Sequence, residues 1–119
     1  MAERLPRADQ AVVPREKLER YLLNPEHEVG RHKARVFASA LGIGQRDWEY
    51  LRDQLETAVV DAPVSSVRET PWGGLCELIL AVDGLNGQTH RVMTVWLVAG
   101  EEEPPRLVTA YVADEQPGA

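Results

Sequence analysis

The sequence predicts an α+β domain in which two to three N-terminal helices pack on a three- to four-stranded antiparallel meander sheet. Up to Val59, apolar residues recur with the spacing of one helix face. From Trp72 onward, they alternate with a period of two or form continuous apolar runs. Asn86-Gly87 and Pro104-Pro105 then separate strand-like runs, as hairpin turns do.

The first half of the chain is expected to hold three helices, over residues 14–23, about 30–41 and about 45–59. Pro14 suits a first helical turn, because the N–H that proline lacks has no partner there. The residue before Pro25 is disfavoured in a helix, so the first helix is expected to end there. Gly42 is the expected C-cap of the second helix.

The second half is expected to hold strands over residues 74–82, 89–99 and 106–113, with residues 63–71 as a loop or a ragged edge strand. Residues 89–99 are largely apolar on both faces, which predicts a central strand covered at least in part on both sides. Trp72 and Trp96 are expected in the core.

Residues 1–13 are polar and lack a period, so they are expected to be a flexible leader before a single domain over residues 14–113. Residues 114–119 are the expected flexible tail. One cysteine, Cys76, excludes an internal disulfide framework. The chain has neither a membrane-length apolar run nor a signal-peptide layout, so the expected compartment is the cytoplasm and no membrane partner is expected.

The composition and motifs exclude several function classes. The net charge of −6 argues against a nucleic-acid-binding role, and no DNA partner is expected. Arg31, Lys33 and Arg35 nevertheless form a local basic cluster, and the local field matters more than the net charge for a small anionic substrate. The sequence lacks a phosphate-binding glycine loop, an HExxH or GxSxG motif, and a cysteine–histidine metal set. No metal and no cofactor is therefore expected, and candidate site residues must be argued from their placement.

Lys33 is the first candidate, because it lies four residues before Phe37 on the helix stripe that should face the core. Either its stem snorkels past apolar neighbours to water, or its ammonium points into a cleft that holds an anion. Arg31 and Arg35 share a face at i, i+4 and line the same cleft or are simply solvated. His32 lies about 100° from Lys33 around the helix, which favours exposure over catalysis.

The strands carry the other candidates. Arg91 and Thr94 interrupt one largely apolar strand, and Thr109 and Tyr111 share a face of the last strand. Strand propensity alone explains any single threonine, but polar groups that recur on adjacent strands also suit a site. Glu77 interrupts the first apolar strand, either as an edge charge or as a carboxylate that faces Lys33 or Arg91.

The stretches NPEHEVGRHKARVFASALG, GLNGQTHRVMTVW and PRLVTAYV resemble an uncharacterised bacterial family of small domains, over about residues 16–113. More distantly, the layout resembles the ribonuclease-toxin folds grouped around barnase, EndoU-type nucleases and RelE-type toxins. The chain departs from those toxins in its acidity and in having no clearly placed general-base histidine on its strands.

The toxin resemblance implies a metal-independent ribonuclease of a bacterial toxin–antitoxin or polymorphic toxin system, with RNA as the substrate. It implies that the catalytic residues are Lys33, His32, Arg91 and Thr109 and that the substrate-binding residues are Arg31, Arg35, Thr94 and Tyr111. The alternative is a non-catalytic protein-binding domain, either an antitoxin- or immunity-like protein or an inactive relative of the toxin fold. A small cognate protein partner is expected in that case, and the acidic loop at residues 101–103 suits a basic one.

Overall fold

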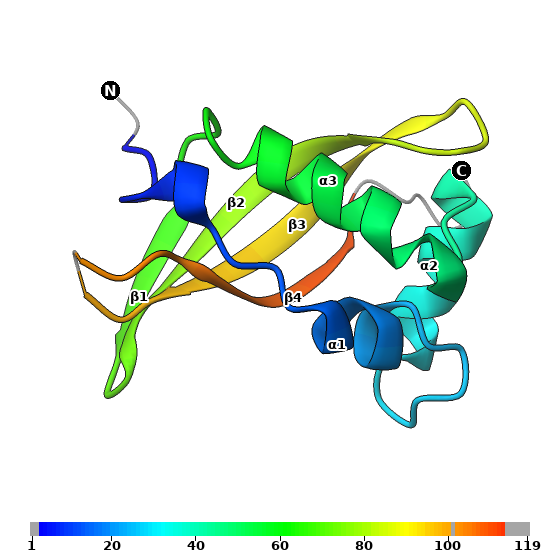
Figure 1. The fold of residues 1–119 in the computed structure, drawn as a ribbon, viewed down its shortest axis with the longest axis horizontal. Coiled ribbons are helices and arrows are strands. Elements are labelled where there is room, and N and C mark those ends of the chain that lie inside the picture. The colour runs from blue at the N-terminus through cyan, green and yellow to red at the C-terminus, as the bar shows by residue number, and fades with distance from the viewer. Residues whose placement is uncertain (1–2, 101, 114–119) are drawn as a thin grey trace.

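The computed structural model describes residues 3–100 and 102–113 and confirms the α+β fold class (Figure 1). The helical segments are α1 (Arg15–Lys17), which continues into the π-helical turn η2 (Leu18–Leu22), α2 (Arg31–Leu41) and α3 (Trp48–Ala58), with two 3-10 turns, η1 (Ala8–Gln10) and η3 (Gln45–Asp47). The strands are β1 (Ser66–Thr70), β2 (Gly73–Asp83), β3 (Thr89–Val98) and β4 (Arg106–Val112). Helices therefore precede the sheet along the chain, as the change in apolar period predicts.

The four strands form one antiparallel sheet in the order β1-β2-β3-β4, so each strand pairs with its neighbour in sequence. The segment predicted as a loop or ragged strand contains the edge strand β1. Asn86-Gly87 lies in the β2–β3 turn, as predicted, and Gly87 takes a left-handed φ of 84°. A bulge between Val95 and Trp96 shifts the pairing with β4, which leaves Val108 as an extra residue.

The predicted C-cap of α2 is confirmed. Gly42 has φ 66°, its N–H bonds the Ala38 carbonyl at 3.0 Å, and the Ile43 N–H bonds the Phe37 carbonyl at 3.2 Å. This pair of hydrogen bonds is the Schellman motif, in which a left-handed residue closes the last helical turn.

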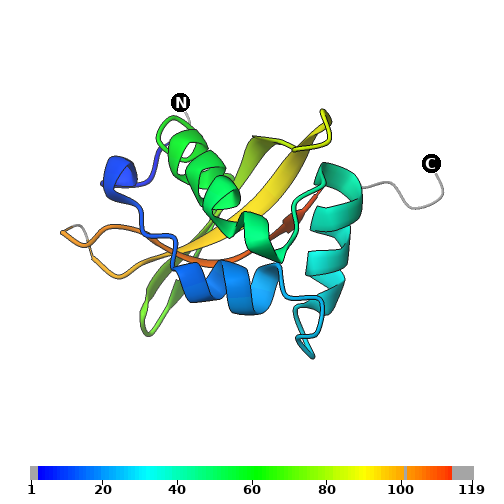
Figure 2. The ribbon, with the colours of Figure 1, turned by 45° about the vertical axis from the view of Figure 1, so that its right-hand side comes forward.

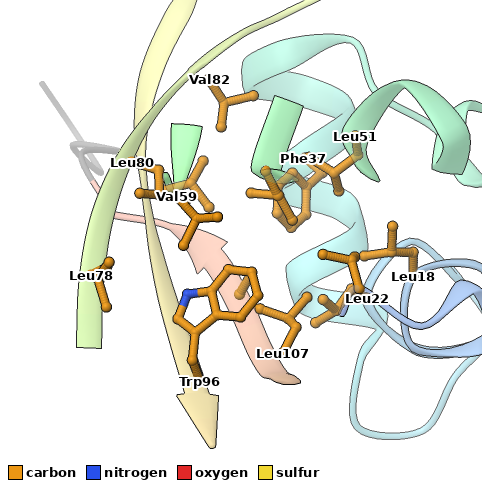
Figure 3. Packing of buried hydrophobic residues seen from close by; sticks show 14 of the residues in the cluster. Leu18, Leu22, Phe37, Leu51, Val59, Leu78, Leu80, Val82, Trp96 and Leu107 are labelled. Atoms are coloured by element: carbon orange, nitrogen blue, oxygen red, sulfur yellow. The ribbon is translucent and has the colours of Figure 1, made fainter. Parts of the chain in front are cut away.

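The core lies between the helices and one face of the sheet (Figure 3). The central side chains are fully buried and come from every layer: Leu18, Leu22, Phe37, Leu51, Val59, Leu78, Val82 and Trp96. Trp96 is buried as predicted, and its indole N–H donates to the Thr94 hydroxyl at 2.7 Å. That hydroxyl donates in turn to the Leu78 carbonyl at 2.7 Å, so both buried polar groups have partners.

The described part of the expected leader, residues 3–13, is packed against the domain. Leu5 and Val13 are buried in the same core cluster. The Val12 N–H donates to the Pro105 carbonyl at 2.8 Å, and its carbonyl accepts from the Leu107 N–H at 2.9 Å. These bonds cover part of the free edge of β4. The described part of this segment is therefore docked on the domain, unlike the flexible leader that the sequence predicts. The expected tail, residues 114–119, lies outside the described residues.

In the part of the chain that the structure describes, no helix covers the other face of the sheet (Figures 1 and 2). Its apolar side chains are half-buried or exposed, and Ile79 and Tyr111 reach 40% and 41% exposure. Helices therefore cover β3 on one side only, and on its other side Met93, Val95 and Leu97 are half-buried. The prediction that Trp72 lies in the core is wrong: it is 75% exposed, in the turn between β1 and β2.

Candidate functional site

Lys33 and Tyr21 form a polar pair between α2 and the first helical segment, which consists of α1 and η2. The Lys33 ammonium donates to the Tyr21 phenol oxygen at 2.8 Å and lies 5.1 Å from the centre of the Tyr21 ring. The Lys17 ammonium lies 5.6 Å from the same ring centre. All three side chains are half-buried, so water and a ligand can reach a phenol that two cations flank.

The position of Tyr21 follows from the π-helical turn η2. Here the Leu23 N–H bonds the Leu18 carbonyl at 2.8 Å, five residues back, so the turn is wider than an α-helical one. Leu18 and Leu22 stay in the core on one side of this turn, while Tyr21 lies at the margin of the core. Turns of this kind occur frequently at functional sites.

The pKa of Tyr21 is lowered from the ordinary value of 10.0. The largest cause is the hydrogen bond from Lys33, which favours the phenolate, whereas burial raises the pKa and opposes it. The charge of Lys33, the Thr109 hydroxyl and the charge of Lys17 lower it further. A tyrosine with a lowered pKa is a stronger acid than tyrosine in water and gives up its proton more readily.

Thr109, on β4, is the second predicted residue that meets this cluster. Its hydroxyl lies close enough to the Tyr21 phenol to lower the pKa of that group, although no hydrogen bond of ordinary geometry is formed. The oxygen is buried and has no hydrogen-bond partner among the described residues. Lys33 and Thr109, predicted from different halves of the chain, therefore meet at Tyr21.

His27 supports the cluster from the loop that precedes α2. Its ring packs edge-on against Tyr21, with centroids 4.9 Å apart. Its Nδ1 accepts hydrogen bonds from the N–H groups of Val29 at 3.0 Å and Gly30 at 2.9 Å. His27 thus fixes the entry of α2 beside Tyr21.

Two neighbouring grooves lie at this edge of the sheet, and Tyr21 lines one of them. One, of about 390 Å³, lies between the first helical segment and the end of the sheet, and its polar lining consists of Glu16, Lys17, Tyr21 and Arg106. The other, of about 440 Å³, lies on the uncovered sheet face and contains Arg68, Glu77, Val95 and Thr109. Val108, the extra residue of the β-bulge, lines both grooves. The two therefore form neighbouring parts of one surface.

Glu77 lies in the sheet groove, in line with Thr109. Glu77 pairs with Val95 across β2 and β3, and Val95 pairs with Thr109 across β3 and β4. Two strand spacings separate the ends of this row, or about 10 Å. The Glu77 carboxylate accepts from the Ser66 hydroxyl at 2.9 Å, which orients it on the groove floor.

The remaining predicted residues lie elsewhere. Thr94 is fully buried and its hydroxyl is bonded within the core, so it cannot contact a ligand at Tyr21. Arg91 and Tyr111 are exposed on the uncovered sheet face, where Tyr111 follows Thr109 by two residues on β4. His32 is exposed on α2.

Arg31 and Arg35 line a different pocket, on α2, from which Lys33 is absent. Residues two apart on a helix lie about 200° around its axis from one another, so Lys33 and these two arginines occupy nearly opposite faces. The single cleft expected from the sequence is thus divided into two sites on either side of α2.

Sequence reasoning missed Tyr21 and His27. Tyr21 shares helical spacing with Leu18 and Leu22, which is the spacing of a core residue, and His27 stands at no spacing from another histidine that marks a site. The available signal was that two neighbouring helices each place one amphipathic side chain, Tyr21 and Lys33, on the stripe that should face the core.

The other side chains with reactive or metal-binding chemistry are less suited to form a site than the Tyr21 cluster. Cys76 is buried, and burial, with a smaller effect of the Glu69 charge, raises the pKa of its thiol, which makes it a poor nucleophile. Among residues 3–100 and 102–113, no three His, Cys, Asp or Glu side chains are arranged to hold a metal ion. Within the same residues, no helix has the length and apolarity to cross a membrane.

Comparisons with known proteins give the family but not the activity. No curated protein and no solved structure matches the chain. The model of one family, a domain of unknown function called DUF6883, matches residues 4–114 and thus nearly the whole chain, including most of the packed N-terminal segment. The protein is therefore a member of the DUF6883 family.

Proposed function

We propose that this domain is a toxin-like ribonuclease that cleaves RNA without a metal ion. The observation that carries the proposal is the Tyr21–Lys33 pair, a phenol with a lowered pKa at the end of a groove with two further cations, Lys17 and Arg106. Such a group is suited to proton transfer beside a phosphate.

The proposed reaction is an internal transesterification. The 2′-oxygen of a ribose attacks the adjacent phosphorus, the bond from phosphorus to the 5′-oxygen breaks, and the products carry a 2′,3′-cyclic phosphate and a 5′-hydroxyl. Glu77 is the proposed acceptor of the 2′-hydroxyl proton. Tyr21 is the proposed donor to the leaving 5′-oxygen, since its lowered pKa makes it the stronger acid.

The cation beside Tyr21 and the cations of the groove have the remaining roles. Lys33 keeps the Tyr21 phenol in place and stabilises the negative charge that develops at the phosphorane oxygens. Lys17 and Arg106 bind flanking phosphates, with the guanidinium offering two parallel N–H donors. Arg91 and Tyr111, further along the same sheet face as Thr109, are proposed contacts for the RNA beyond the cleaved bond.

The test is cleavage of a short single-stranded RNA by the purified protein in the presence of EDTA. Tyr21→Phe is expected to lower the rate about 10²–10⁴-fold, the usual contribution of one proton-transfer group. Lys33→Met is expected to act in the same direction. Arg46→Gln changes an exposed arginine outside both grooves and is the matched control, with an unchanged rate.

Substrate chemistry provides a second control. An RNA with one 2′-deoxyribose at the cleaved position has no internal nucleophile and should remain intact at that bond. Induced expression of the wild type is expected to arrest growth and fragment total RNA, and Tyr21→Phe should relieve both effects. A folded wild-type protein that leaves RNA intact in both assays contradicts the proposal.

The second candidate function is a non-catalytic protein-binding domain. The uncovered sheet face favours it, because Ile79 and Tyr111 expose large apolar side chains there, and such surfaces often mark protein contacts. In this case Ile79→Lys should abolish capture of a specific small partner from the native host, whereas Tyr21→Phe should leave capture unchanged. The opposite pattern, with RNA cleavage, favours the ribonuclease.

A further inference from the structure

The pocket on α2 is a separate site from the grooves beside Tyr21. Its volume is about 550 Å³, within the range of pockets that hold small organic ligands. Its floor is apolar and consists of Leu23, Pro25, Ala34 and Ala38, and its polar groups include Arg31 and Arg35, one helical turn apart. None of these residues lines either groove beside Tyr21.

The charge of this pocket is unbalanced. Among the residues that the structure describes, its lining contains two arginines and no acidic residue, whereas each of the two neighbouring grooves at the sheet edge contains a glutamate. Neither Arg31 nor Arg35 has an ion pair among the described residues, in contrast to Arg15, which pairs with Glu19 at 2.9 Å. The imbalance is notable in a chain whose net charge is −6.

The position of these two arginines on α2 makes the excess of positive charge less favourable. α2 begins at Arg31 and has no acidic residue in its first turn, where the positive end of the helix dipole favours carboxylates and disfavours cations. Like charges at i, i+4 also repel one another. Arg31 and Arg35 therefore lower the stability of the free helix slightly, and an anion held between them would reverse that effect.

The lining restricts what the anion can be. No aromatic side chain of the described part of the chain lines the pocket, so these residues offer no stacking platform of the kind that single-stranded RNA bases use. The apolar floor instead suits an aliphatic body, and two adjacent guanidinium groups suit a planar carboxylate. We propose that this pocket binds an amphipathic organic acid, with its carboxylate between Arg31 and Arg35 and its aliphatic chain over Ala34 and Ala38. This inference does not depend on the ribonuclease proposal.

The experiment is a titration of the ¹⁵N-labelled protein with sodium octanoate, followed by two-dimensional ¹H–¹⁵N NMR. Ligands of about ten heavy atoms bind a pocket of this kind with a Kd on the order of 1 mM. The expected result is a saturable shift of amide signals confined to residues 23–24, 31–39 and 44–45. No saturable shift, or shifts centred on other residues, overturns the proposal.

Two analogues test both parts of the ligand. Acetate lacks the aliphatic body and 1-octanol lacks the charge, so each is expected to bind at least about 10-fold more weakly than octanoate. Equal binding of either analogue overturns the claim of amphipathic recognition. Octyl phosphate shows which anionic head group the arginines prefer, and its binding supports the proposal provided that 1-octanol binds weakly.

Variants identify the site. Arg31→Gln combined with Arg35→Gln is expected to weaken octanoate binding about 10-fold or more. Arg20→Gln combined with Arg68→Gln removes the same charge from two exposed positions outside the pocket and should leave binding unchanged. Both arginines on α2 are exposed, so the double variant should fold; Ala38→Leu fills the floor without changing the charge and should also abolish binding. An unaltered affinity in both α2 variants overturns the proposal.

Discussion

At the scale of single residues, Thr94 and Thr109 show how differently two strand threonines can be used. Thr94 is fully buried and bonded to both the Leu78 carbonyl and the Trp96 indole, whereas the buried Thr109 oxygen has no hydrogen-bond partner among the described residues. A buried polar group with partners stabilises the fold, and one without them costs free energy.

Threonine-to-valine substitutions at these two positions should therefore change the free energy of unfolding by different amounts or in opposite directions. Thr94→Val leaves the Trp96 indole N–H unpaired and should lower the free energy of unfolding by about 1–3 kcal/mol. Thr109→Val should change it by less than about 0.5 kcal/mol or raise it. Urea denaturation curves of the two isosteric variants measure the difference, and equal losses would contradict this account of Thr109.

The ionisation of Tyr21 is the second prediction at this scale. Its folded-state pKa lies below the ordinary 10.0, so folding favours the phenolate. The pairing with Lys33 therefore adds stability above the ordinary tyrosine pKa, and this stability is lost as the pH falls through the folded-state value. Lys33→Met removes the largest cause of the shift and should move the pKa of Tyr21 upward, toward or beyond the ordinary value, because burial remains.

The measurement is a pH titration of the ¹³Cζ signals of tyrosine, assigned by Tyr21→Phe. The control is Arg46→Gln, which removes a positive charge outside both grooves and should leave the titration of Tyr21 in place. An unchanged midpoint in Lys33→Met would show that the hydrogen bond does not control this phenol.

Lys33 and Thr109 are predictable as site residues because their polar groups interrupt apolar patterns. The sequence could not separate Thr109 from Thr94, because β3 and β4 are apolar on both faces and alternation then does not reveal which face meets the helices. The partner of Lys33 was hidden for a related reason: the Tyr21 ring meets the spacing of a core residue, while its phenol oxygen lies outside the core.

At the scale of elements, Gly30 sets how closely α2 approaches the first helical segment. Its backbone is ordinary, with φ −79°, so conformational freedom is not what glycine provides here. A Cβ at this position would collide with the carbonyl oxygen of Tyr21 and lie 2.8 Å from a carbon of the Tyr21 ring. The missing side chain is therefore what lets α2 begin directly against Tyr21.

Gly30→Ala is accordingly expected to separate the two elements. The clash involves backbone that cannot rotate away, so the free energy of unfolding should fall by about 1–3 kcal/mol, as for an overpacked core. The distance from Lys33 to Tyr21 should increase, which would also raise the pKa of Tyr21. Gly100→Ala is the matched control: a Cβ there meets no atom within 4 Å, and the denaturation midpoint should stay the same.

The order of elements was predictable, and their ends were less so. The change from helical to strand period separates the two halves of the chain, and Gly42 and Asn86-Gly87 carry their own turn chemistry. The π-helical turn at Leu18–Leu22 has no such sequence signal, since the apolar spacing of Leu18 and Leu22 suits an ordinary helix equally well.

At the scale of the whole molecule, the N-terminal segment is part of the folded unit. It reads as polar and aperiodic because only isolated side chains, among them Leu5 and Val13, enter the core, and single contacts produce no period. Trp72 gives the converse error: an aromatic residue predicts burial, but its place in the β1–β2 turn leaves it exposed.

Leu5→Ala tests this view of the N-terminal segment. A buried leucine that becomes alanine typically costs about 2–5 kcal/mol, whereas the same change in a flexible leader costs nothing. Thermal unfolding followed by circular dichroism should therefore show a clearly lower Tm for Leu5→Ala. Pro6→Ala, at an exposed neighbouring position, should stay close to the wild type. A wild-type Tm in Leu5→Ala would mean that the segment is not docked in solution.

The hydrogen bonds of Val12 with Pro105 and Leu107 join two parts of the chain that are synthesised at very different times. Every pair of neighbouring strands is joined by a short connection, so the hairpins can form soon after each strand emerges. Val12 must wait for β4, although it is synthesised long before it. During synthesis, the N-terminal segment should thus remain open to proteases and other proteins until the last strand is complete, and its docking should be the closing step of folding.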